Sequence, residues 1–338
     1  MNAMLAVGQA GYETLLAGEL AAGGRPVGAQ GPGWALLGAG GRGPEPEAVF
    51  AHLLLPEPVE LRAGSVNALA RATLDINARS VRTERIETAW PCCWSGAGGT
   101  TGLNRRSAAV AKAFHELLRR RLSRVAALAR ADAPGGPGTA RGLFVHFTAF
   151  DCAWASRDAV LGGQRRMADD PAAPSRSYLK VEEAYGLLGA EPRADYTVAD
   201  LGAAPGGWSY SAARRGARVV AVDNGPLKGG ARSHPRIEHR RADAFKFRPE
   251  PGETFDWLFC DLVEEPHHVL RDLVAPWLER RWCRRFIVNL KFGRTDPLRL
   301  LRELRAASSP LVASAAAFRI RHLYHDREEF TVVGRVDC

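Results

Sequence analysis

The stretch ADLGAAPGGWSY, residues 199–210, constrains the fold of this chain more than any other segment. The residues just before it, 196–199, are mostly apolar and partly β-branched, which is typical of a buried strand, and a helical pattern begins at Ser209. Between them lie an acidic residue, small residues, a proline and two glycines. Glycines and small residues in such a turn let the backbone approach a ligand closely. The segment therefore predicts a ligand-binding loop at the end of a strand.

The length of 338 residues favours two domains, because a single hydrophobic core rarely serves so long a chain. Up to about residue 150 the hydrophobic spacing predicts a mixed α and β region. Strands are expected there at residues 4–7, 34–37 and 143–150, and helices at residues 13–22 and 46–55. Residues 158–174 are polar and rich in glycine and proline, which predicts a linker between the domains.

The region after residue 174 alternates strand-like and helical segments. Strands are expected at residues 196–201, 218–222, 255–260, 285–290 and 330–333. This alternation is typical of a doubly wound α/β sheet, so we predict a Rossmann-like layer in the second domain. In such sheets ligands bind beyond the carboxyl ends of the strands, which is where the loop after Leu201 lies.

The composition is that of an ordinary globular protein, with 46% hydrophobic and 25% charged residues. No apolar run is long enough to span a bilayer, and the N-terminal residues lack the basic region of a secretory signal. We therefore expect a soluble, cytoplasmic protein without membrane contact, and a monomer. The spacing of the cysteines does not suit zinc, so we expect no metal and free thiols at Cys92, Cys93, Cys152, Cys260, Cys283 and Cys338.

Basic residues gather in one predicted helix. Its apolar residues recur at spacings of three and four between Val110 and Leu128, so they form one face. Between Arg105 and Arg130 the sequence has eight basic residues and a single acidic one, Glu116. Such a run fits a solvated helix surface and equally a footprint for the phosphates of a nucleic acid. The formal net charge of +9 suits a polyanionic partner without identifying it.

Lysine is scarce in this chain. Of the 46 basic residues, five are lysines: Lys112, Lys180, Lys228, Lys246 and Lys291. Arginine stays protonated in proteins, whereas the pKa of a lysine can be tuned so that it acts as a base. A chain that uses arginine almost everywhere is therefore expected to keep some of its lysines for that property.

The predicted loop lacks the glycine pattern of a dinucleotide site. A pyrophosphate needs G-x-G-x-x-G, whereas residues 202–207 read GAAPGG, which disfavours an NAD-dependent reductase. A nucleoside without phosphate fits better. Asp223 ends the next strand and can accept both hydroxyls of a ribose, although a simple turn aspartate is the alternative, and Asp243 can receive an adenine amino group. S-adenosylmethionine has a ribose with two hydroxyls, an adenine amino group and, in addition, a sulfonium.

Several motifs together resemble the FtsJ-type RNA 2′-O-ribose methyltransferases. They are SRSYLKVEEA, DLGAAPGGWSY, VDNGP, FCDLVEEP, VNLKFG and LYHDREEFTV, in this order between residues 174 and 333. Within that family the chain is most similar to the RlmM type, which modifies a cytidine of 23S ribosomal RNA. The N-terminal region resembles the RNA-binding half of the same family through GYETLLAGEL and VHFTAFDCAW. The resemblance implies a ferredoxin-like segment at 1–60, a THUMP-like RNA-binding domain at 61–157 and a Rossmann-like, S-adenosylmethionine-dependent methyltransferase domain at 175–338.

The resemblance also marks a catalytic set of Lys, Asp, Lys and Glu, here Lys180, Asp261, Lys291 and Glu329. Asp261 and Lys291 each follow an apolar strand, and Glu329 precedes a strand that runs antiparallel in this fold, so all three should reach one edge of the sheet. We expect Lys291 to be the general base that takes the proton of the 2′-hydroxyl. Burial and the ammonium of Lys180 would lower the pKa of Lys291, whereas the two carboxylates would raise it. The sequence leaves that balance open.

Cofactor binding is assigned to the loop and to neighbouring strand ends, namely to Ser177, Ala204, Pro205, Gly206, Gly207, Trp208, Asp223, Asp243 and Asp261. Ser177 resembles a serine of the family that contacts the cofactor, although its position also suits a helix N-cap. Ala204 stands where relatives often have cysteine. This small-for-small change should leave cofactor binding intact.

Other methyl acceptors fit less well. A base-amine methyltransferase usually has Asn or Asp followed by Pro-Pro and an aromatic residue, but Asp261 is followed by Leu-Val-Glu. A cytosine C5 enzyme needs a cysteine nucleophile after a proline, and Cys260 lies inside an apolar strand. A ribose oxygen is therefore the expected acceptor and 23S rRNA the expected partner. A methyltransferase for another RNA, and a non-catalytic RNA-binding or ribosome-assembly factor with a retained cofactor pocket, remain as alternatives.

Overall fold

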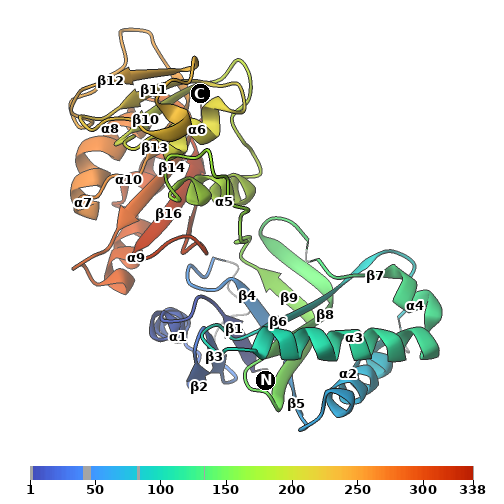
Figure 1. Ribbon diagram of the computed structural model, residues 1–338. Helices are drawn as coiled ribbons and strands as arrows, with labels where there is room; N and C mark the ends of the chain where they lie inside the picture. The colour runs from blue at the N-terminus through green and yellow to red at the C-terminus, as the bar shows by residue number, and fades with distance from the viewer. Residues whose placement is uncertain (1–2, 41–46, 82–83, 133, 338) are drawn as a thin grey trace. The chain divides into compact units, whose positions relative to one another are not determined.

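The computed structural model describes residues 3–40, 47–81, 84–132 and 134–337. The chain forms two compact units, residues 1–163 and residues 164–338 (Figure 1). The boundary falls within the segment expected to be a linker, but residues 158–161 of that segment are the end of strand β9 (Cys152–Leu161). Each unit has its own sheet.

The N-terminal unit is built on one sheet. Its strands are β1 (Met4–Val7), β2 (Val27–Gly31), β3 (Trp34–Leu37), β4 (Leu53–Pro56), β5 (Val59–Arg62), β6 (Trp90–Gly96), β7 (Ala129–Arg130), β8 (Gly138–Phe147) and β9. The strand order is β2-β3-β1-β4-β9-β8-β6-β7, and β5 also pairs with β9. Strands of the expected ferredoxin-like and THUMP-like segments thus share a continuous sheet. The division of this unit into two domains stays a prediction.

The helices of this unit are α1 (Glu13–Ala22), α2 (Val66–Val81), α3 (Leu103–Arg121) and α4 (Ser123–Leu128). The four-residue spacing of Val110, Phe114 and Leu118 places all three on one face of α3, where they are fully buried in the core with residues of α2, β6 and β8. The predicted basic helix is confirmed, but it is interrupted at Leu122, where φ is −141° and ψ is 66°. The chain therefore turns between α3 and α4.

The helix predicted at residues 46–55 is wrong. Residue 46 lies outside the described residues, and residues 53–56 form β4, which pairs with β1 on one side and β9 on the other. A short apolar run such as LLLP suits a buried strand as well as a helix, and here the neighbouring strands decide. The strands predicted at 4–7 and 34–37 and the helix predicted at 13–22 have the expected bounds.

The C-terminal unit has a seven-stranded sheet. Its strands are β10 (Thr197–Leu201), β11 (Arg218–Val222), β12 (Ile237–Arg240), β13 (Phe255–Cys260), β14 (Cys283–Lys291), β15 (Ala317–Arg321) and β16 (Glu329–Arg335). The order is β12-β11-β10-β13-β14-β16-β15. The strands from β12 to β14 are parallel, and β16 is antiparallel to both β14 and β15. The predicted Rossmann-like, doubly wound sheet is thereby confirmed. The strand order reverses between β10 and β13, because the chain runs outward from β10 to β11 and β12 and then returns to β13 on the other side of β10.

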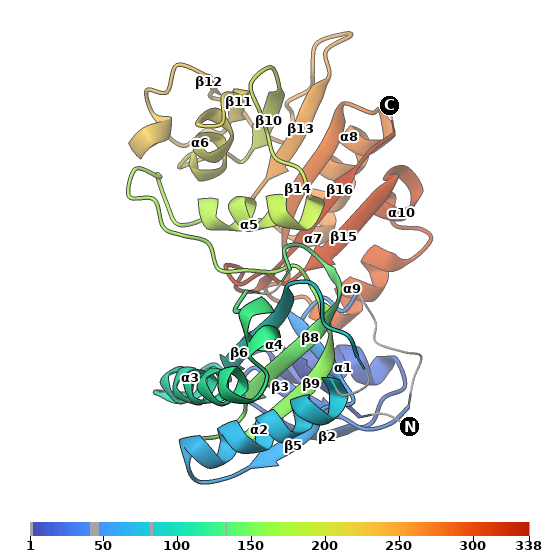
Figure 2. The same cartoon turned by 90° about the vertical axis from the view of Figure 1, so that its right-hand side faces the viewer.

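Helical segments cover both faces of this sheet. They are α5 (Tyr178–Leu188), α6 (Gly207–Ala213), the 3-10 turn η1 (Gly229–Ala231), α7 (Pro266–His268), the π-helical turn η2 (Val269–Val274), α8 (Ala275–Glu279), α9 (Pro297–Arg305) and α10 (Pro310–Ser314). Figure 2 shows α5 and α6 on one side of the sheet and α8 and α10 on the other. Trp208 of α6 packs edge-on against Phe259 of β13, with ring centroids 5.8 Å apart.

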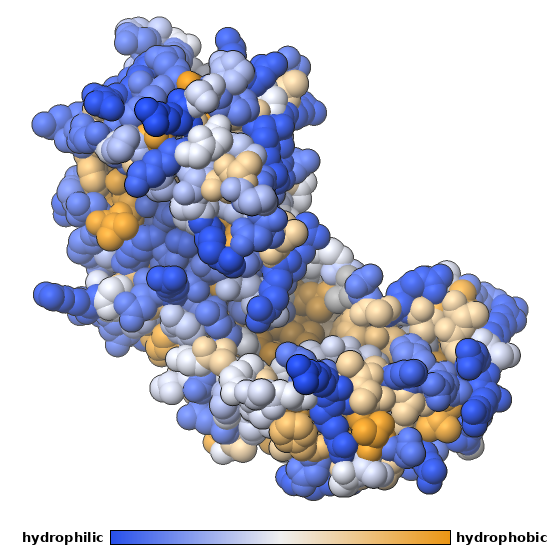
Figure 3. Space-filling model, in the orientation of Figure 1, coloured by the Kyte–Doolittle hydropathy of each residue, from blue (hydrophilic) through white to orange (hydrophobic). Residues whose placement is uncertain are grey.

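The part of the C-terminal unit's surface that is in view in Figure 3 is mostly hydrophilic. Among the described residues, no helix combines the length and the apolar character that crossing a bilayer demands.

Candidate active site

The glycine loop, residues 202–207, leads from β10 into the first residue of α6, and at two of its glycines the backbone has a conformation that residues with a Cβ rarely adopt. Gly202 has a φ of +80° and Gly206 a φ of +104°. A Cβ at Gly202 would overlap the side chain of Leu262, and one at Gly206 would lie 2.6 Å from the Cβ of Ala231. Both positions therefore require glycine, for conformation and for space.

Ser177 lies against the glycine loop. It is the N-cap residue of α5, but its hydroxyl makes no capping hydrogen bond and lies 2.8 Å from Ser175 Oγ. A Cβ at Gly207 would be 3.0 Å from Ser177 Oγ and 3.1 Å from Ser175 Oγ, so both hydroxyls face the loop. The indole of Trp208 is buried and donates to the carbonyl of Ser177 at 3.0 Å. The side chain of Trp208 therefore belongs to the core.

Asp223 follows β11 and turns its carboxylate toward the glycine loop. Its Oδ2 accepts from the amide of Ala204 at 2.9 Å, and its Oδ1 accepts from the amide of Gly225 at 2.7 Å. Asp223 is therefore a turn aspartate, yet each oxygen has a second lone pair for a ligand hydroxyl. Asp243 follows β12 and accepts from the amide of Phe245 at 2.9 Å, with its side chain 42% exposed.

Four charged side chains from separate elements meet at one edge of the sheet. We call them the tetrad: Lys180 in α5, Asp261 directly after β13, Lys291 at the end of β14 and Glu329 at the start of β16. Lys291 and Glu329 are opposed in the antiparallel register of β14 and β16. The predicted meeting of Asp261, Lys291 and Glu329 at one edge is thus observed, and Lys180 joins them from the helix that covers this edge.

Each carboxylate of the tetrad bridges both ammonium groups. Lys180 Nζ lies 2.6 Å from Glu329 Oε1 and 3.5 Å from Asp261 Oδ2. Lys291 Nζ contacts the other oxygen of each acid, Asp261 Oδ1 and Glu329 Oε2. The side chains are between 5% and 20% exposed. The result is a closed, largely buried ring of alternating charge.

Charged neighbours decide the protonation of Lys291 and Glu329 in this structure. Burial lowers the pKa of Lys291, but Asp261 and Glu329 outweigh burial, and the pKa of this amine lies above its usual value. Burial likewise opposes ionisation of Glu329, but Lys291 and Lys180 outweigh it, and the pKa of this acid is lowered. The sequence left open whether burial or the carboxylates determine the pKa of Lys291, and in the structure the carboxylates do, so its charged form is favoured.

The glycine loop and the tetrad are neighbours because β10 and β13 are adjacent strands. Leu201 and Cys260 are opposed in the register, so the loop and Asp261 leave the sheet side by side. Asp200, the acid of the opening stretch, is a buried residue of β10 and accepts from Ser209 Oγ at 2.6 Å. Burial, assisted by repulsion from nearby acids, raises the pKa of Asp200 to about 7 against the effect of the Ser209 hydrogen bond.

Three buried polar residues next to the tetrad were missed by the sequence analysis. They are Asn289 in β14, Thr331 in β16 and Asp326 before β16. A signal for two of them exists, since Asn289 and Thr331 lie two residues from Lys291 and Glu329 and interrupt the apolar runs at 286–290 and 330–333.

The described residues give no support for a cysteine nucleophile at residue 260 or for a metal site with histidine or cysteine ligands. Cys260 is fully buried, and burial raises the pKa of its thiol to about 12. The free cysteines include Cys92, Cys93, Cys152, Cys260 and Cys283, as predicted, whereas Cys338 lies outside the described residues. Within the described ranges, His, Cys, Asp and Glu side chains do not gather in threes as a metal ion would require.

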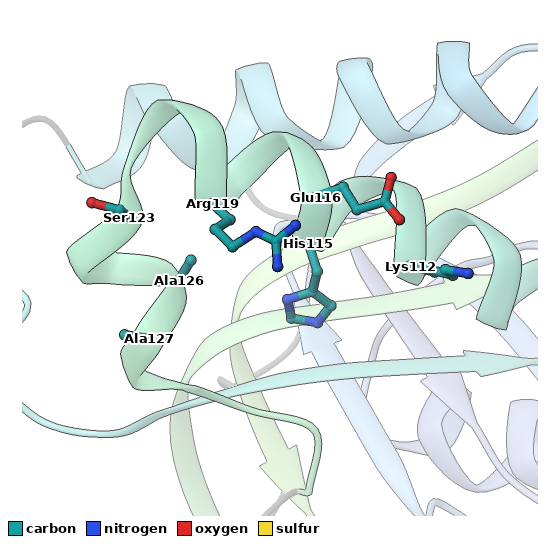
Figure 4. Close-up of a pocket in the computed structure, with 7 residues that line it drawn as sticks. All are labelled: Lys112, His115, Glu116, Arg119, Ser123, Ala126 and Ala127. Carbon is teal, nitrogen blue, oxygen red and sulfur yellow. The ribbon is translucent and has the colours of Figure 1, made fainter.

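A groove of about 430 Å³ lies between α3 and α4 in the N-terminal unit (Figure 4). Figure 4 shows His115 and Arg119 beside each other on α3, with Ala126 and Ala127 on the facing turn of α4. Lys112, Glu116 and Ser123 complete the lining. Burial lowers the pKa of His115, so this imidazole is neutral at pH 7, and the exposed positive charge comes from the lysine and arginine side chains.

The family model described as FtsJ-like methyltransferase matches residues 173–282. A protein of Marinomonas sp. (strain MWYL1), named Ribosomal RNA large subunit methyltransferase M, is 42% identical over 179 residues, 50% of this chain and 50% of its own length. Its namesake in Azoarcus sp. (strain BH72) is 39% identical over 232 residues, 64% of this chain and 62% of its own length.

Among solved structures, TrmN from Thermus thermophilus aligns over 99% of this chain and 100% of its own, with 16% identity and a TM-score of 0.37. The matches to the curated relatives cover about half of their length, or 62% at most in the two cited above. The matched residues include the glycine loop and Asp261. The C-terminal unit of this chain therefore carries an FtsJ-like methyltransferase domain.

Proposed function

We propose that this protein transfers a methyl group from S-adenosylmethionine to the 2′-oxygen of a ribose in 23S rRNA, at a cytidine. The observation that carries the proposal is the tetrad at the carboxyl edge of the sheet, next to the glycine loop. The relatives are named as methyltransferases of large-subunit ribosomal RNA, which supports this class of substrate. The choice of cytidine rests on the resemblance of the motifs alone.

The residues around the glycine loop suit S-adenosylmethionine. Glycine at 206 allows the positive φ and the close packing of the loop against Ala231, Asp223 keeps acceptor capacity for ribose hydroxyls, and Asp261 offers a carboxylate to a cation. The residues that would hold the cofactor are Ser177, Ala204, Pro205, Gly206, Gly207, the backbone of Trp208, Asp223, Asp243 and Asp261. When bound, this cofactor supplies an electrophilic methyl group on a positively charged sulfur.

The tetrad would hold and deprotonate the ribose hydroxyl. A hydroxyl is a weak nucleophile until its proton is removed, so a base near the oxygen accelerates transfer. In the proposed step Lys291 Nζ, as the free amine, would take this proton, and the oxygen would accept the methyl group that the cofactor gives up as it becomes S-adenosylhomocysteine. Because the pKa of Lys291 is raised in the substrate-free protein, the amine first has to lose a proton. Lys180 and a cation bound beside Asp261 both disfavour the ammonium form and assist that loss.

The N-terminal unit would bind the RNA. The exposed side of α3 and α4 carries Lys112, Arg119, Arg120 and Arg124, with Glu116 as the acidic residue between them. A surface that is mostly positively charged suits RNA phosphates, and contacts to phosphates do not depend on the base sequence. The target nucleotide would then be selected by RNA shape and by which unpaired nucleotide can bring its ribose to the tetrad.

The proposal is tested by measuring methyl transfer in two variants that lack the lysine base. Tritium from labelled S-adenosylmethionine is expected in 23S rRNA with the wild-type chain, at a rate about 10²- to 10⁴-fold lower in Lys291→Ala. Lys291→Arg keeps the charge but cannot be deprotonated, so it is expected to be as inactive. Both variants should bind S-adenosylhomocysteine within about threefold of wild type.

The outcomes separate the alternatives. A wild-type chain that binds S-adenosylhomocysteine and RNA but transfers no tritium would support a non-catalytic assembly factor. A thermal shift with NADH instead of S-adenosylhomocysteine would support a reductase. Mapping 2′-O-methyl groups by mass in rRNA from cells with and without the protein identifies the nucleotide, and a lost methyl group outside 23S rRNA would contradict the proposed substrate.

A further inference from the structure

The tetrad rests on a buried polar layer. Side chains alternate along a strand, so Asn289 and Lys291 of β14 point to the same face, and Thr331 and Glu329 oppose them on β16. Asn289 and Thr331 are both 0% exposed. One step further from the edge, on the same face, the opposed pair is apolar and belongs to the core: Ile287 and Val333.

A chain of hydrogen bonds runs through this layer to the tetrad. Asn289 Nδ2 donates to Asp261 Oδ1 at 3.1 Å. Thr331 Oγ1 lies 2.6 Å from Asn289 Oδ1, and it lies 2.9 Å from Asp326 Oδ2 and 3.1 Å from Asp326 Oδ1. Asp326, which is 1% exposed, also accepts from the amide of Leu323 at 2.9 Å. The layer thus joins Asp261 of the tetrad to a second, buried acid.

The donor and the acceptor of each hydrogen bond in this series follow from the contacts of Asp261. Asp261 is paired with two ammonium groups and accepts only, so Asn289 must present its amide nitrogen to Asp261 and its oxygen to Thr331. The single hydroxyl proton of Thr331 then goes to Asn289. Thr331 has lone pairs left for Asp326, so Asp326 is the donor and therefore a neutral carboxylic acid.

The surroundings of Asp326 favour this neutral form. Glu329 faces it with negative charge and Lys180 with positive charge, and Glu183 adds repulsion at pH values where it is ionised. Burial, followed by repulsion from Glu329, raises the pKa of Asp326 well above its usual value. A neutral donor at this position leaves both ammonium groups of the tetrad to Asp261 and Glu329.

A buried polar layer is costly unless every group in it is bonded, and apolar residues would pack here as they do at Ile287. We propose that Asn289, Thr331 and Asp326 are positioning residues, which hold Asp261 so that its Oδ1 faces Lys291 while the ribose hydroxyl is deprotonated. All three are buried, and none is assigned a contact with substrate. The inference rests on the proposed function for its kinetic effect, but the orientation of Asp261 can be tested without activity.

The deciding variant is Thr331→Val, which keeps the shape and removes the hydroxyl. Thr73→Val is the matched control, because Thr73 is equally buried, donates to the carbonyl of Leu69 at 2.8 Å, and lies in the N-terminal unit. With 13Cε-labelled lysine the five lysines give five side-chain signals, and Lys291→Arg assigns the one of interest. In Thr331→Val the pKa of Lys291 is expected to fall by roughly one unit, because Asp261 is no longer held against the amine.

Kinetics give the second readout. Thr331→Val is expected to lower kcat for methyl transfer by about 10- to 100-fold, with KM values for cofactor and RNA within about threefold. Thr331→Ser restores the hydroxyl and should restore kcat. Asp326→Asn keeps a neutral donor toward Thr331 and should stay near wild type in both readouts, whereas a tenfold loss there would overturn the neutral form of Asp326.

The other possible results also decide whether these residues position Asp261. A Lys291 titration in Thr331→Val equal to that in Thr73→Val overturns the positioning role. If Thr331→Val does not fold, Thr331→Cys, with a near-isosteric but weak donor, is expected to show the same changes to a smaller extent, and an unchanged Lys291 there is equally decisive. If the wild-type chain transfers no methyl group, the proposed function fails, while the lysine titration still tests the orientation of Asp261.

Discussion

Lys291 and Glu329 are opposed at the ends of two antiparallel strands, and their side chains form an ion pair. This pairing closes the tetrad, because Glu329 also binds Lys180 and Asp261 binds both lysines. Glu329 is the most buried of the four side chains, at 5% exposure. The effect of removing its charge is therefore the most direct test of the ring.

We predict that Glu329→Gln destabilises the protein by about 3 kcal/mol and abolishes methyl transfer. Two ammonium groups would then share one carboxylate in a largely buried site, which leaves positive charge uncompensated. Urea denaturation and the tritium assay measure the two effects. The matched control is Glu328→Gln, because Glu328 is the preceding residue and is exposed. Equal effects of the two substitutions would show that the ring has no special role.

The rate of methyl transfer is expected to rise with pH. The pKa of Lys291 is raised, so the amine is protonated at pH 7 and the fraction of free base grows about tenfold per pH unit below that pKa. Single-turnover rates measured between pH 7 and pH 9.5 test this. A flat profile in the wild-type chain, with the chemical step rate-limiting, would contradict Lys291 as the base.

Stability is expected to fall as pH rises from about 4.5 to about 8, owing to Glu183. This acid is 0% exposed, and burial raises its pKa to about 8 against the effect of backbone amides of Tyr324, Arg165 and His325. The folded state then binds a proton that the unfolded state has already lost, so unfolding is favoured by about 1.4 kcal/mol per pH unit within this window.

The variant Glu183→Gln removes this proton from both states. Its free energy of unfolding, measured by denaturant titration at several pH values, should lose the contribution of Glu183 between pH 4.5 and pH 8. A slope unchanged from wild type would place the pKa of Glu183 near that of an ordinary glutamate.

Gly206→Ala is expected to impair both folding and cofactor binding. The φ of +104° disfavours a Cβ, and the added methyl would lie 2.6 Å from the Cβ of Ala231, so the loop has to move. Gly252→Ala is the matched control, with a φ of +85° but no atom within 4 Å of the new methyl. Both should lose about 1 kcal/mol to backbone strain, and Gly206→Ala a further ~1–3 kcal/mol to overpacking. Binding of S-adenosylhomocysteine should weaken in Gly206→Ala alone.

Charge reversal at Lys112 and Arg119 is expected to weaken RNA binding. Each lost phosphate contact lowers the slope of log affinity against log salt by about one. Fluorescence anisotropy with an RNA fragment at several salt concentrations measures this slope. Arg62→Glu is the control in the same unit, because Arg62 is exposed and already paired with Glu60. A slope equal to that of the control would assign the basic face of α3 to solvation.

The local sequence determined where the elements of the C-terminal unit lie and which residues carry charge at their ends. Continuous apolar runs at 219–222 and 257–260 mark buried parallel strands, because both faces of such strands are covered. The glycines of the loop are equally local, since a positive φ is a property of one residue. By contrast, LLLP at 53–56 joins a sheet because of strands that are distant in sequence.

Only the tertiary structure decided how the charges act on one another. Lys180 and Glu329 are far apart in sequence, and their contact depends on how α5 packs over the edge of the sheet. The protonation of Lys291 depends on distances to two carboxylates and on burial, none of which a sequence contains. The same holds for the link from Thr331 through Asn289 to Asp261, because hydrogen-bond partners are set by register and packing.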